Sequence, residues 1–178
     1  MIYAQTLRKH VGTASLVLCI ALLPGLSEAK GPMASAGASD VGALEAGGTI
    51  GFQTGNGLTQ FRLTGEGQYG LLTLAPQWEL DLAGHIGLLL GDFTTFEIVP
   101  AARVRYLLDN KLSVYGDGGL GIAFASSNTW GVLRFAGGVQ YKLTRQIILV
   151  GEPVGLNVYF GTGSGFQYGL AAGALYRF

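Results

Sequence analysis

Hydrophobic and polar residues alternate along most of the chain, and this alternation predicts β-strands. In residues 70–83 the apolar side chains occupy the even positions, while polar side chains, including Glu79 and Asp81, occupy odd ones. A period of two places the apolar residues on one face of a strand and the polar residues on the other. The same alternation recurs in residues 96–106 and 133–143. Each of these segments is therefore expected to form a strand with one apolar and one polar face.

Repetition of the pattern from Gly42 onward predicts about eight strands separated by turns. The expected strands cover residues 42–53, 70–82, 86–92, 95–108, 112–125, 130–143, 147–160 and 167–178. Three-residue turns are expected at 83–85, 109–111 and 144–146, and a long connection at 54–69, in which residues 58–64 are a candidate extension of the second strand. Tight turns at one end, varied connections at the other and an even strand number favour an up-and-down barrel with both termini at one end.

Composition then distinguishes a membrane barrel from a soluble one. Charged residues make up only 12% of the chain, and 30 of its 178 residues are glycine. After residue 29, no run approaches the roughly 18 apolar residues of a membrane-spanning helix. Only helices and closed barrels satisfy every backbone polar group in lipid, so the sequence predicts an all-β protein, a closed antiparallel transmembrane β-barrel. The alternative is a soluble lipocalin-type barrel, which would place its apolar side chains inside rather than on the outer face expected here.

The first residues differ from the rest of the chain and are typical of a secretory signal peptide. Arg8 and Lys9 precede an apolar stretch over residues 11–26, and Ser27 and Ala29 supply the small residues of a cleavage site. A membrane-anchoring helix is the alternative, but the stretch is shorter than the roughly 20 residues that such a helix requires. The sequence thus predicts three parts: a cleaved signal peptide (1–29), a flexible lead-in rich in Ala, Ser and Gly (30–41), and the barrel (42–178).

The composition of the chain after residue 29 argues against several classes of site. Its nine Lys and Arg residues against ten Asp and Glu residues leave no basic stripe for a nucleic acid. The only cysteine, Cys19, lies in the predicted signal peptide, which excludes disulfides. His85 is the one histidine of this part and is expected in a turn, so neither a metal site nor a Ser-His-Asp set is favoured. We therefore expect no cofactor, no metal and no enzymatic activity.

The last expected strand carries the most specific motif of the chain. Tyr168, Leu170, Tyr176 and Phe178 share one face, and the chain ends on the aromatic residue. This motif resembles the C-terminal β-signal of outer-membrane proteins. Over about residues 42–178 the chain resembles the small eight-stranded outer-membrane family that includes the OmpA barrel domain, OmpX and OmpW. The resemblance implies a place in the outer membrane of a Gram-negative cell envelope, with outer-membrane lipid and the barrel assembly machinery as partners.

Charged residues on the polar faces are the main candidates for a functional site. With 109–111 as a turn, Arg103 falls directly opposite Asp117, and such a pair stabilises a sheet by roughly 0.2–1 kcal/mol. The strand count would direct Glu152 towards lipid, so we expect a bulge at Pro153 that turns this carboxylate inward. The predicted interior network consists of Glu79, Asp81, Arg103, Arg105, Asp117, Arg134 and Glu152.

Two interpretations of this network remain open. The lumen of an eight-stranded barrel is only wide enough for side chains to fill, which favours a plug of ion pairs and a structural or surface-interaction role. In the alternative, the charges line a narrow channel or transport barrel for small molecules, including apolar ones, as in OmpW-like proteins. A lipid-modifying enzyme of the envelope is disfavoured, because His85 is expected at the wrong end of the barrel.

Aromatic residues near the strand ends form a second candidate set. Trp and Tyr are enriched where a barrel meets the two membrane–water interfaces, since each combines an apolar ring with a polar group. The residues expected in such a girdle are Trp78, Tyr106, Trp130 and Tyr141.

Overall fold

The computed structural model describes residues 40–125, 128–161 and 164–178. The predicted signal peptide (1–29) and most of the lead-in lie outside the described residues. In the described part, no helix is long and apolar enough to cross a membrane. The strands are β1 (Leu44–Gly55), β2 (Leu58–Ala75), β3 (Trp78–Leu90), β4 (Thr95–Leu107), β5 (Leu112–Ala125), β6 (Asn128–Lys142), β7 (Ile147–Gly161) and β8 (Gly165–Arg177).

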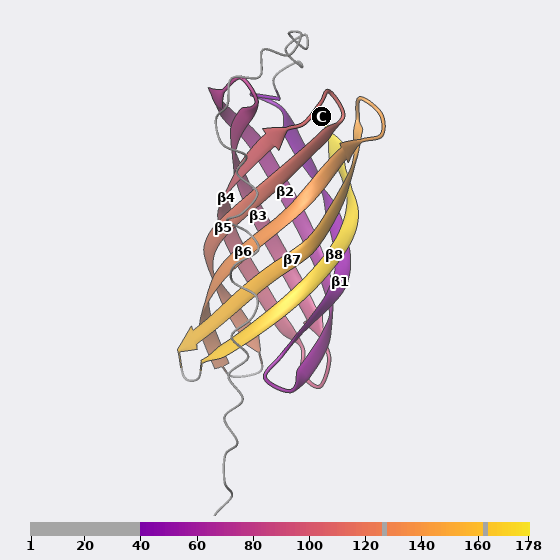
Figure 1. Ribbon diagram of the computed structural model, residues 1–178. Coiled ribbons are helices and arrows are strands. Elements are labelled where there is room, and N and C mark those ends of the chain that lie inside the picture. The colour runs from indigo at the N-terminus through magenta and orange to yellow at the C-terminus, as the bar shows by residue number, and fades with distance from the viewer. Residues whose placement is uncertain (1–39, 126–127, 162–163) are drawn as a thin grey trace, which may run out of the picture. The chain divides into compact units, whose positions relative to one another are not determined.

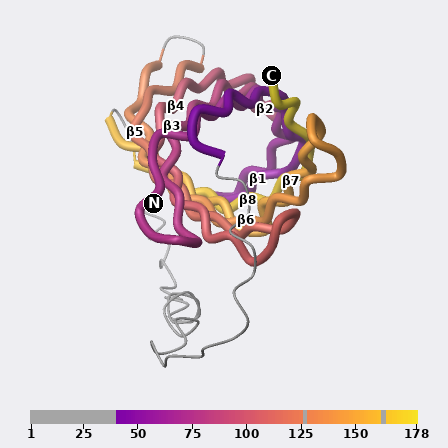
Figure 2. Tube along the Cα trace, turned by 90° about the horizontal axis from the view of Figure 1, so that it is seen from above, coloured from indigo at the N-terminus to yellow at the C-terminus, as the bar shows by residue number. Residues whose placement is uncertain are grey.

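Each strand pairs antiparallel with the next, and β1 pairs with β8, so the sheet closes into an up-and-down barrel (Figure 1). Seen along its axis, the backbone of the barrel forms a ring (Figure 2). We call the interior of this ring, which side chains fill, the lumen. The start of β1 and the end of β8 lie side by side, since Glu45 pairs with Arg177. We call this the terminal end of the barrel and the opposite one the distal end.

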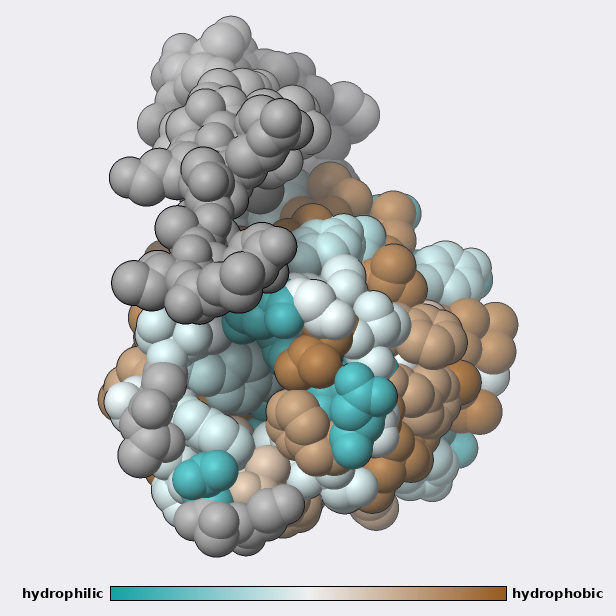
Figure 3. Space-filling view, turned by 90° about the horizontal axis from the view of Figure 1, so that it is seen from below, coloured by the Kyte–Doolittle hydropathy of each residue, from teal (hydrophilic) through white to brown (hydrophobic). Residues whose placement is uncertain are grey.

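Alternation along the strands separates charge from hydrophobic surface. Every charged side chain of the described strands lies on the inner face. Of the other described charges, Asp40 is buried before β1, and the rest, such as Asp92 and Arg145, lie in turns. The outer face carries large apolar side chains, of which Leu120 is 61% exposed. Figure 3 views the distal end and shows hydrophilic side chains inside a partial rim of hydrophobic ones. This distribution suits a wall that contacts lipid on its outer side.

The structure corrects the sequence prediction at β2 and β3. Residues 70–82 are not one strand, because a two-residue turn separates the end of β2 from the start of β3. The turn expected at 83–85 lies instead in the middle of β3. The long connection expected at 54–69 is largely β2, preceded by a tight turn at Asn56 and Gly57, whose φ angles are 52° and 79°. Two successive positive φ values are typical of an Asn-Gly hairpin turn.

β7 contains the one strand proline expected to disturb the sheet. The register between β7 and β8 shifts between Glu152 and Gly155, and the Tyr168 hydroxyl donates a hydrogen bond of 2.8 Å to the Pro153 carbonyl. Glu152 is 3% exposed and points to the inner face, where the expected bulge would direct it. The expectation that the strand count directs Glu152 towards lipid is wrong, because Ile148 and Val150 are buried on the same inner face and Glu152 follows them by plain alternation. The shift comes after Glu152 and brings Asn157, at an odd position, to the inner face as well.

Candidate functional site in the barrel interior

Side chains from all eight strands meet in the lumen and form two groups of ion pairs, one that includes Arg103 and one around Arg105. Gln68 of β2 links the two groups, because it accepts a hydrogen bond from Arg103 and donates one to Glu45. Among the described residues, eight carboxylates pair with six Arg and Lys side chains and with His85. The carboxylates are Asp40, Glu45, Glu66, Glu79, Asp81, Glu97, Asp117 and Glu152, and the Arg and Lys residues are Arg62, Arg103, Arg105, Arg134, Lys142 and Arg177.

Arg103 of β4 is the centre of this network. Its register partner is Asp117 of β5, and the guanidinium lies 2.7 Å from the Asp117 carboxylate. Arg103 also pairs with Glu66 of β2 and lies 4.0 Å above the Tyr115 ring. The Arg103 side chain is 0% exposed. Charge-assisted hydrogen bonds and a cation–π contact thus replace the water that this guanidinium loses.

His85 lies beside the same carboxylate, and the prediction that it sits in a turn is wrong. It is a β3 residue with a side chain 1% exposed, and its Nε2 atom lies 3.4 Å from Asp117 Oδ2. The register of β3 continues through His85 to Val99 of β4, so the histidine takes an inward position of the alternation. It therefore faces the packed lumen and not the lipid.

Towards the distal end, a second cluster joins β2, β4, β6 and β7. Arg134 donates to both oxygens of Glu152 at 2.6 Å. Arg62 lies 3.4 Å from Glu152 and 3.5 Å from Glu97. Two arginines thus share the inward carboxylate of Glu152.

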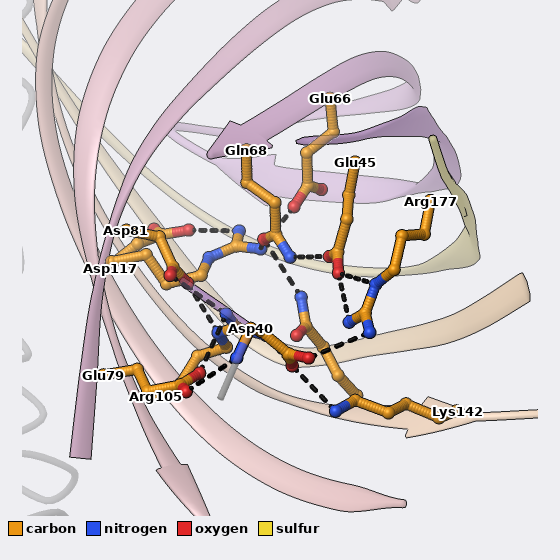
Figure 4. A network of polar contacts seen from close by, with 12 residues as sticks. Asp40, Glu45, Glu66, Gln68, Glu79, Asp81, Arg105, Asp117, Lys142 and Arg177 are labelled. Carbon is orange, nitrogen blue, oxygen red and sulfur yellow. Dashed lines mark hydrogen bonds and ion pairs between the residues drawn. The ribbon is translucent and has the colours of Figure 1, made fainter. Parts of the chain in front are cut away.

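At the terminal end, Asp40 closes the lumen (Figure 4). Its carboxylate lies 3.1 Å from Arg105, 2.7 Å from Lys142 and 2.9 Å from Arg177, and its backbone N–H donates to Glu79 at 3.0 Å. Burial alone raises the pKa of the Asp40 carboxyl, but the hydrogen bond and charge of Lys142 and the two arginines hold this pKa below its usual value. Asp40 belongs to the segment expected to be flexible, so sequence reasoning missed it.

The predicted residues of this end come together around one arginine. Arg105 lies 2.6 Å from Asp81 and 3.1 Å from Glu79. The seven residues predicted for the interior network all lie on the inner face. Those that sequence reasoning missed are Asp40, Glu45, Arg62, Glu66, His85, Glu97, Lys142 and Arg177.

The distal end of the lumen is uncharged and built from amides. Asn157 donates to Gln53 at 2.9 Å, Gln53 donates to Gln167, and Gln167 donates to Gln60 at 3.3 Å. Gln53 also donates to the Tyr159 hydroxyl at 2.8 Å. Nothing in the alternation distinguishes these amides from surface residues, which explains why the sequence did not single them out.

The predicted interface aromatics divide between the two faces. Trp78 and Tyr106 lie on the outer face with ring centroids 4.8 Å apart, and Tyr141 is exposed there as well. The prediction is wrong for Trp130, which shares the inward positions of Val132 and Arg134 and lines a cavity at the distal end. The place of Trp130 at the end of a strand suggested an interface residue. The alternation of β6, however, puts its side chain on the inner face.

The residues of the resembled terminal signal lie together on the outer face of β8. Tyr168, Leu170 and Tyr176 are exposed, and the Tyr176 and Phe178 ring centroids are 5.1 Å apart. The backbone N–H of Phe178 donates to the Leu44 carbonyl at 3.0 Å, so the last residue still pairs with β1. The Phe178 side chain is 75% exposed.

Comparison with known proteins shows the fold. No family model matches the sequence, and no curated protein matches it. Among solved structures, the chain is similar to the N-terminal β-barrel domain of Pseudomonas aeruginosa OprF, with TM-score 0.56 and 13% identity over 78% of this chain and 98% of that one. It is also similar to the outer membrane enzyme PagL (TM-score 0.57, 14% identity, 76% and 97% covered). A third similar structure is Neisserial surface protein A, with TM-score 0.54 and 15% identity over 76% of this chain and 96% of that one.

Proposed function

We propose that this chain, which has the fold of small eight-stranded outer-membrane barrels, is a closed barrel with a structural or surface-interaction role. The observation that carries the proposal is the filled lumen. Arg103, Arg105 and Arg134 reach into it from β4 and β6, and each side chain is at most 2% exposed. Guanidinium groups that are ion-paired and shielded from water support a plug of ion pairs, rather than an aqueous path.

The proposed location is the outer membrane of a Gram-negative cell, reached by export with a cleaved signal peptide. The lipid-suited outer face and the fold of the similar structures support this location. The exposed aromatic end of β8 supports recognition by the barrel assembly machinery. Recovery of the mature protein from the soluble periplasm, rather than from outer-membrane fractions, would contradict the proposal.

Two other functions are weighed against this one. A narrow transport barrel is supported by the continuity of the polar interior, which runs from Asp40 at the terminal end through Gln68 to Glu97 nearer the distal end. A lipid-modifying enzyme is supported only by the likeness to PagL, which at 14% identity concerns the fold. The burial of His85 on the lumen side argues against this enzyme, because a lipid substrate would approach from the outer face.

Single-channel recording in planar bilayers tests the closed barrel against the transport barrel. We expect the refolded wild-type chain to be silent, with refolding verified by its heat-dependent shift on a gel. Reproducible conductance steps that change in Arg103→Ala, but not in Arg145→Ala, would overturn the closed barrel in favour of a path through the charges. Arg145 is a suitable control because it lies exposed in the β6–β7 turn.

A further inference from the structure

A cavity of about 180 Å³ opens at the distal end of the barrel, the end that faces the viewer in Figure 3. Its lining includes Gln60, Gln167, Tyr159, Trp130, Leu89 and Phe93. These side chains come from the β3–β4 turn and from five strands, so the closed barrel itself fixes their positions. The cavity is therefore preformed and does not depend on a single loop.

One part of the cavity is a row of fixed amides. Gln167 donates to Gln60 at 3.3 Å, and Gln60 donates to the Phe93 carbonyl at 3.3 Å. Deeper in the lumen, Gln53 contacts Gln167 and holds Tyr159, whose hydroxyl donates to Glu97 at 3.2 Å. A side-chain amide has two N–H donors and an oxygen with two lone pairs, so Gln60 and Gln167 retain bonding capacity beyond this row. Held in place, they present donors and acceptors of set direction.

Apolar groups supply the rest of the wall. Trp130 and Tyr159 bring aromatic rings, and Leu89 is 1% exposed and closes the side of β3. Of the described residues that line the cavity, none is charged. Glu97 lies below Tyr159, but its charge is paired with Arg62. An ionic ligand would thus find no counter-charge here, whereas a purely apolar one would leave the amides without partners.

We infer that this cavity binds one neutral sugar ring. A pyranose combines a face of C–H groups, which packs on an aromatic ring, with an edge of hydroxyls that both donate and accept hydrogen bonds. The cavity offers these two surfaces in matching form, through Trp130 on one side and Gln60 and Gln167 on the other. Its volume is below the roughly 300 Å³ typical of drug-sized sites, so it would hold a single ring. That ring is either a free monosaccharide or the terminal sugar of a longer glycan.

Tryptophan fluorescence tests the inference directly. The chain has two tryptophans, and Trp78 lies on the outer face at the terminal end, so Trp78→Phe leaves Trp130 as the only indole emitter. This variant, refolded in detergent, is titrated with the methyl glycosides of glucose, galactose and N-acetylglucosamine, with a neutral trisaccharide and with glucuronate. We expect a saturable change in emission for at least one neutral sugar, with half-saturation at about 1 mM for a single ring. We expect no saturable change with glucuronate.

Variants separate binding from folding. Adding Gln167→Leu should weaken binding roughly tenfold or more, because a hydroxyl loses its partner, while the heat-dependent gel shift persists. Gln77→Leu, an exposed glutamine of the β2–β3 turn, is the matched control and should bind as before. Tighter binding of the trisaccharide than of its terminal methyl glycoside would identify a glycan end as the ligand, and equal binding would identify a free sugar. No saturable change with any neutral sugar, or an equal response in Gln167→Leu, would overturn the inference.

This inference deepens the proposed surface role and rests on it for the orientation of the distal end. The two can fail separately. A conducting barrel that still binds a sugar would reject the closed interior and leave the binding site. A silent barrel that binds no sugar would reject only the site.

Discussion

Charged side chains inside the barrel lose their hydration on folding and gain ion partners instead. This replacement determines how much a single substitution destabilises the barrel. Removing one partner of a buried pair leaves the other charge without water and without an ion, at a cost of several kcal/mol. Replacing both partners by apolar groups avoids this penalty. The Arg103–Asp117 pair, with both side chains 0% exposed, is the clearest case.

A double-mutant cycle on Arg103→Ala and Asp117→Ala should therefore show strong coupling. We expect an interaction free energy of roughly 1–3 kcal/mol, measured by urea unfolding of the barrel in lipid vesicles. The exposed residues Arg145 and Asp92 lie in turns at opposite ends, and their alanine variants should be additive within about 0.5 kcal/mol. Additivity of the buried pair would mean that the observed register does not couple these residues.

Asp40 should make stability depend on pH. Because its pKa is lowered in the folded state, its stabilisation is full above the unfolded pKa of about 4 and disappears as the pH falls through the lower folded value. We expect Asp40→Asn to cost roughly 1–3 kcal/mol of unfolding free energy at pH 7, and the difference from wild type to shrink below about pH 4. Unfolding curves at several pH values measure this difference. Asp92→Asn, in an exposed turn, should be neutral at pH 7, and an equal loss there would contradict the role given to Asp40.

At the scale of strands, the alternation of polar and apolar residues predicts where most strands lie, but it does not show where the turn between β2 and β3 falls. From β4 to β8 the expected strands agree with the structure within a few residues. The error at β2 and β3 has two causes. Apolar residues occupy the even positions from Leu72 to Leu82, so the alternation continues without a break across the two-residue turn and hides it. In β2, Gly65 and Gly67 take outward positions where bulky apolar residues were expected, so the segment resembles a polar loop.

The candidate site divides in the same way. Arg103 and Asp117 could be paired from sequence because a short turn fixes the register of β4 and β5. Asp40 could not be predicted, since it precedes β1 and its partners lie on β4, β6 and β8. Contacts across the lumen depend on closure of the whole ring, and no local pattern encodes them. The amide row of the distal end is of this kind too.

The end of β8 leads to a prediction about assembly. If the aromatic terminus is read by the assembly machinery, Phe178→Ala should lower the amount of folded protein in the outer membrane several-fold, as judged by heat-modifiable bands. Its refolding in detergent should be nearly unchanged, because the Phe178 side chain is 75% exposed and supports little packing. Phe166→Ala, also exposed and at the other end of β8, is the control and should assemble normally. Equal membrane levels of both variants would reject the signal.

At the scale of the whole molecule, the barrel inverts the distribution of a soluble protein. The charges of its described strands face the lumen and most of their leucines face outward, so the outer wall contributes to stability only in lipid. Leu120→Arg, near the middle of β5, should cost roughly 2–4 kcal/mol of unfolding free energy in vesicles. Leu108→Arg, in the β4–β5 turn, should cost about 0–1 kcal/mol. Equal costs at the two positions would mean that β5 does not cross the hydrocarbon layer.

The inward charges also affect the export of the chain, which the proposed location in the outer membrane requires. A nascent chain bound for the outer membrane must first cross the inner one, where a long apolar segment is retained as a helix. Placing a polar or charged residue at nearly every second position interrupts each apolar run, so no strand of this barrel resembles a stop-transfer segment while it is extended. The side chains that pack the finished lumen thus also keep the unfolded chain hydrated in transit. These polar side chains become buried only when the barrel closes. Closure also gathers the apolar side chains into one outer face that can contact a bilayer.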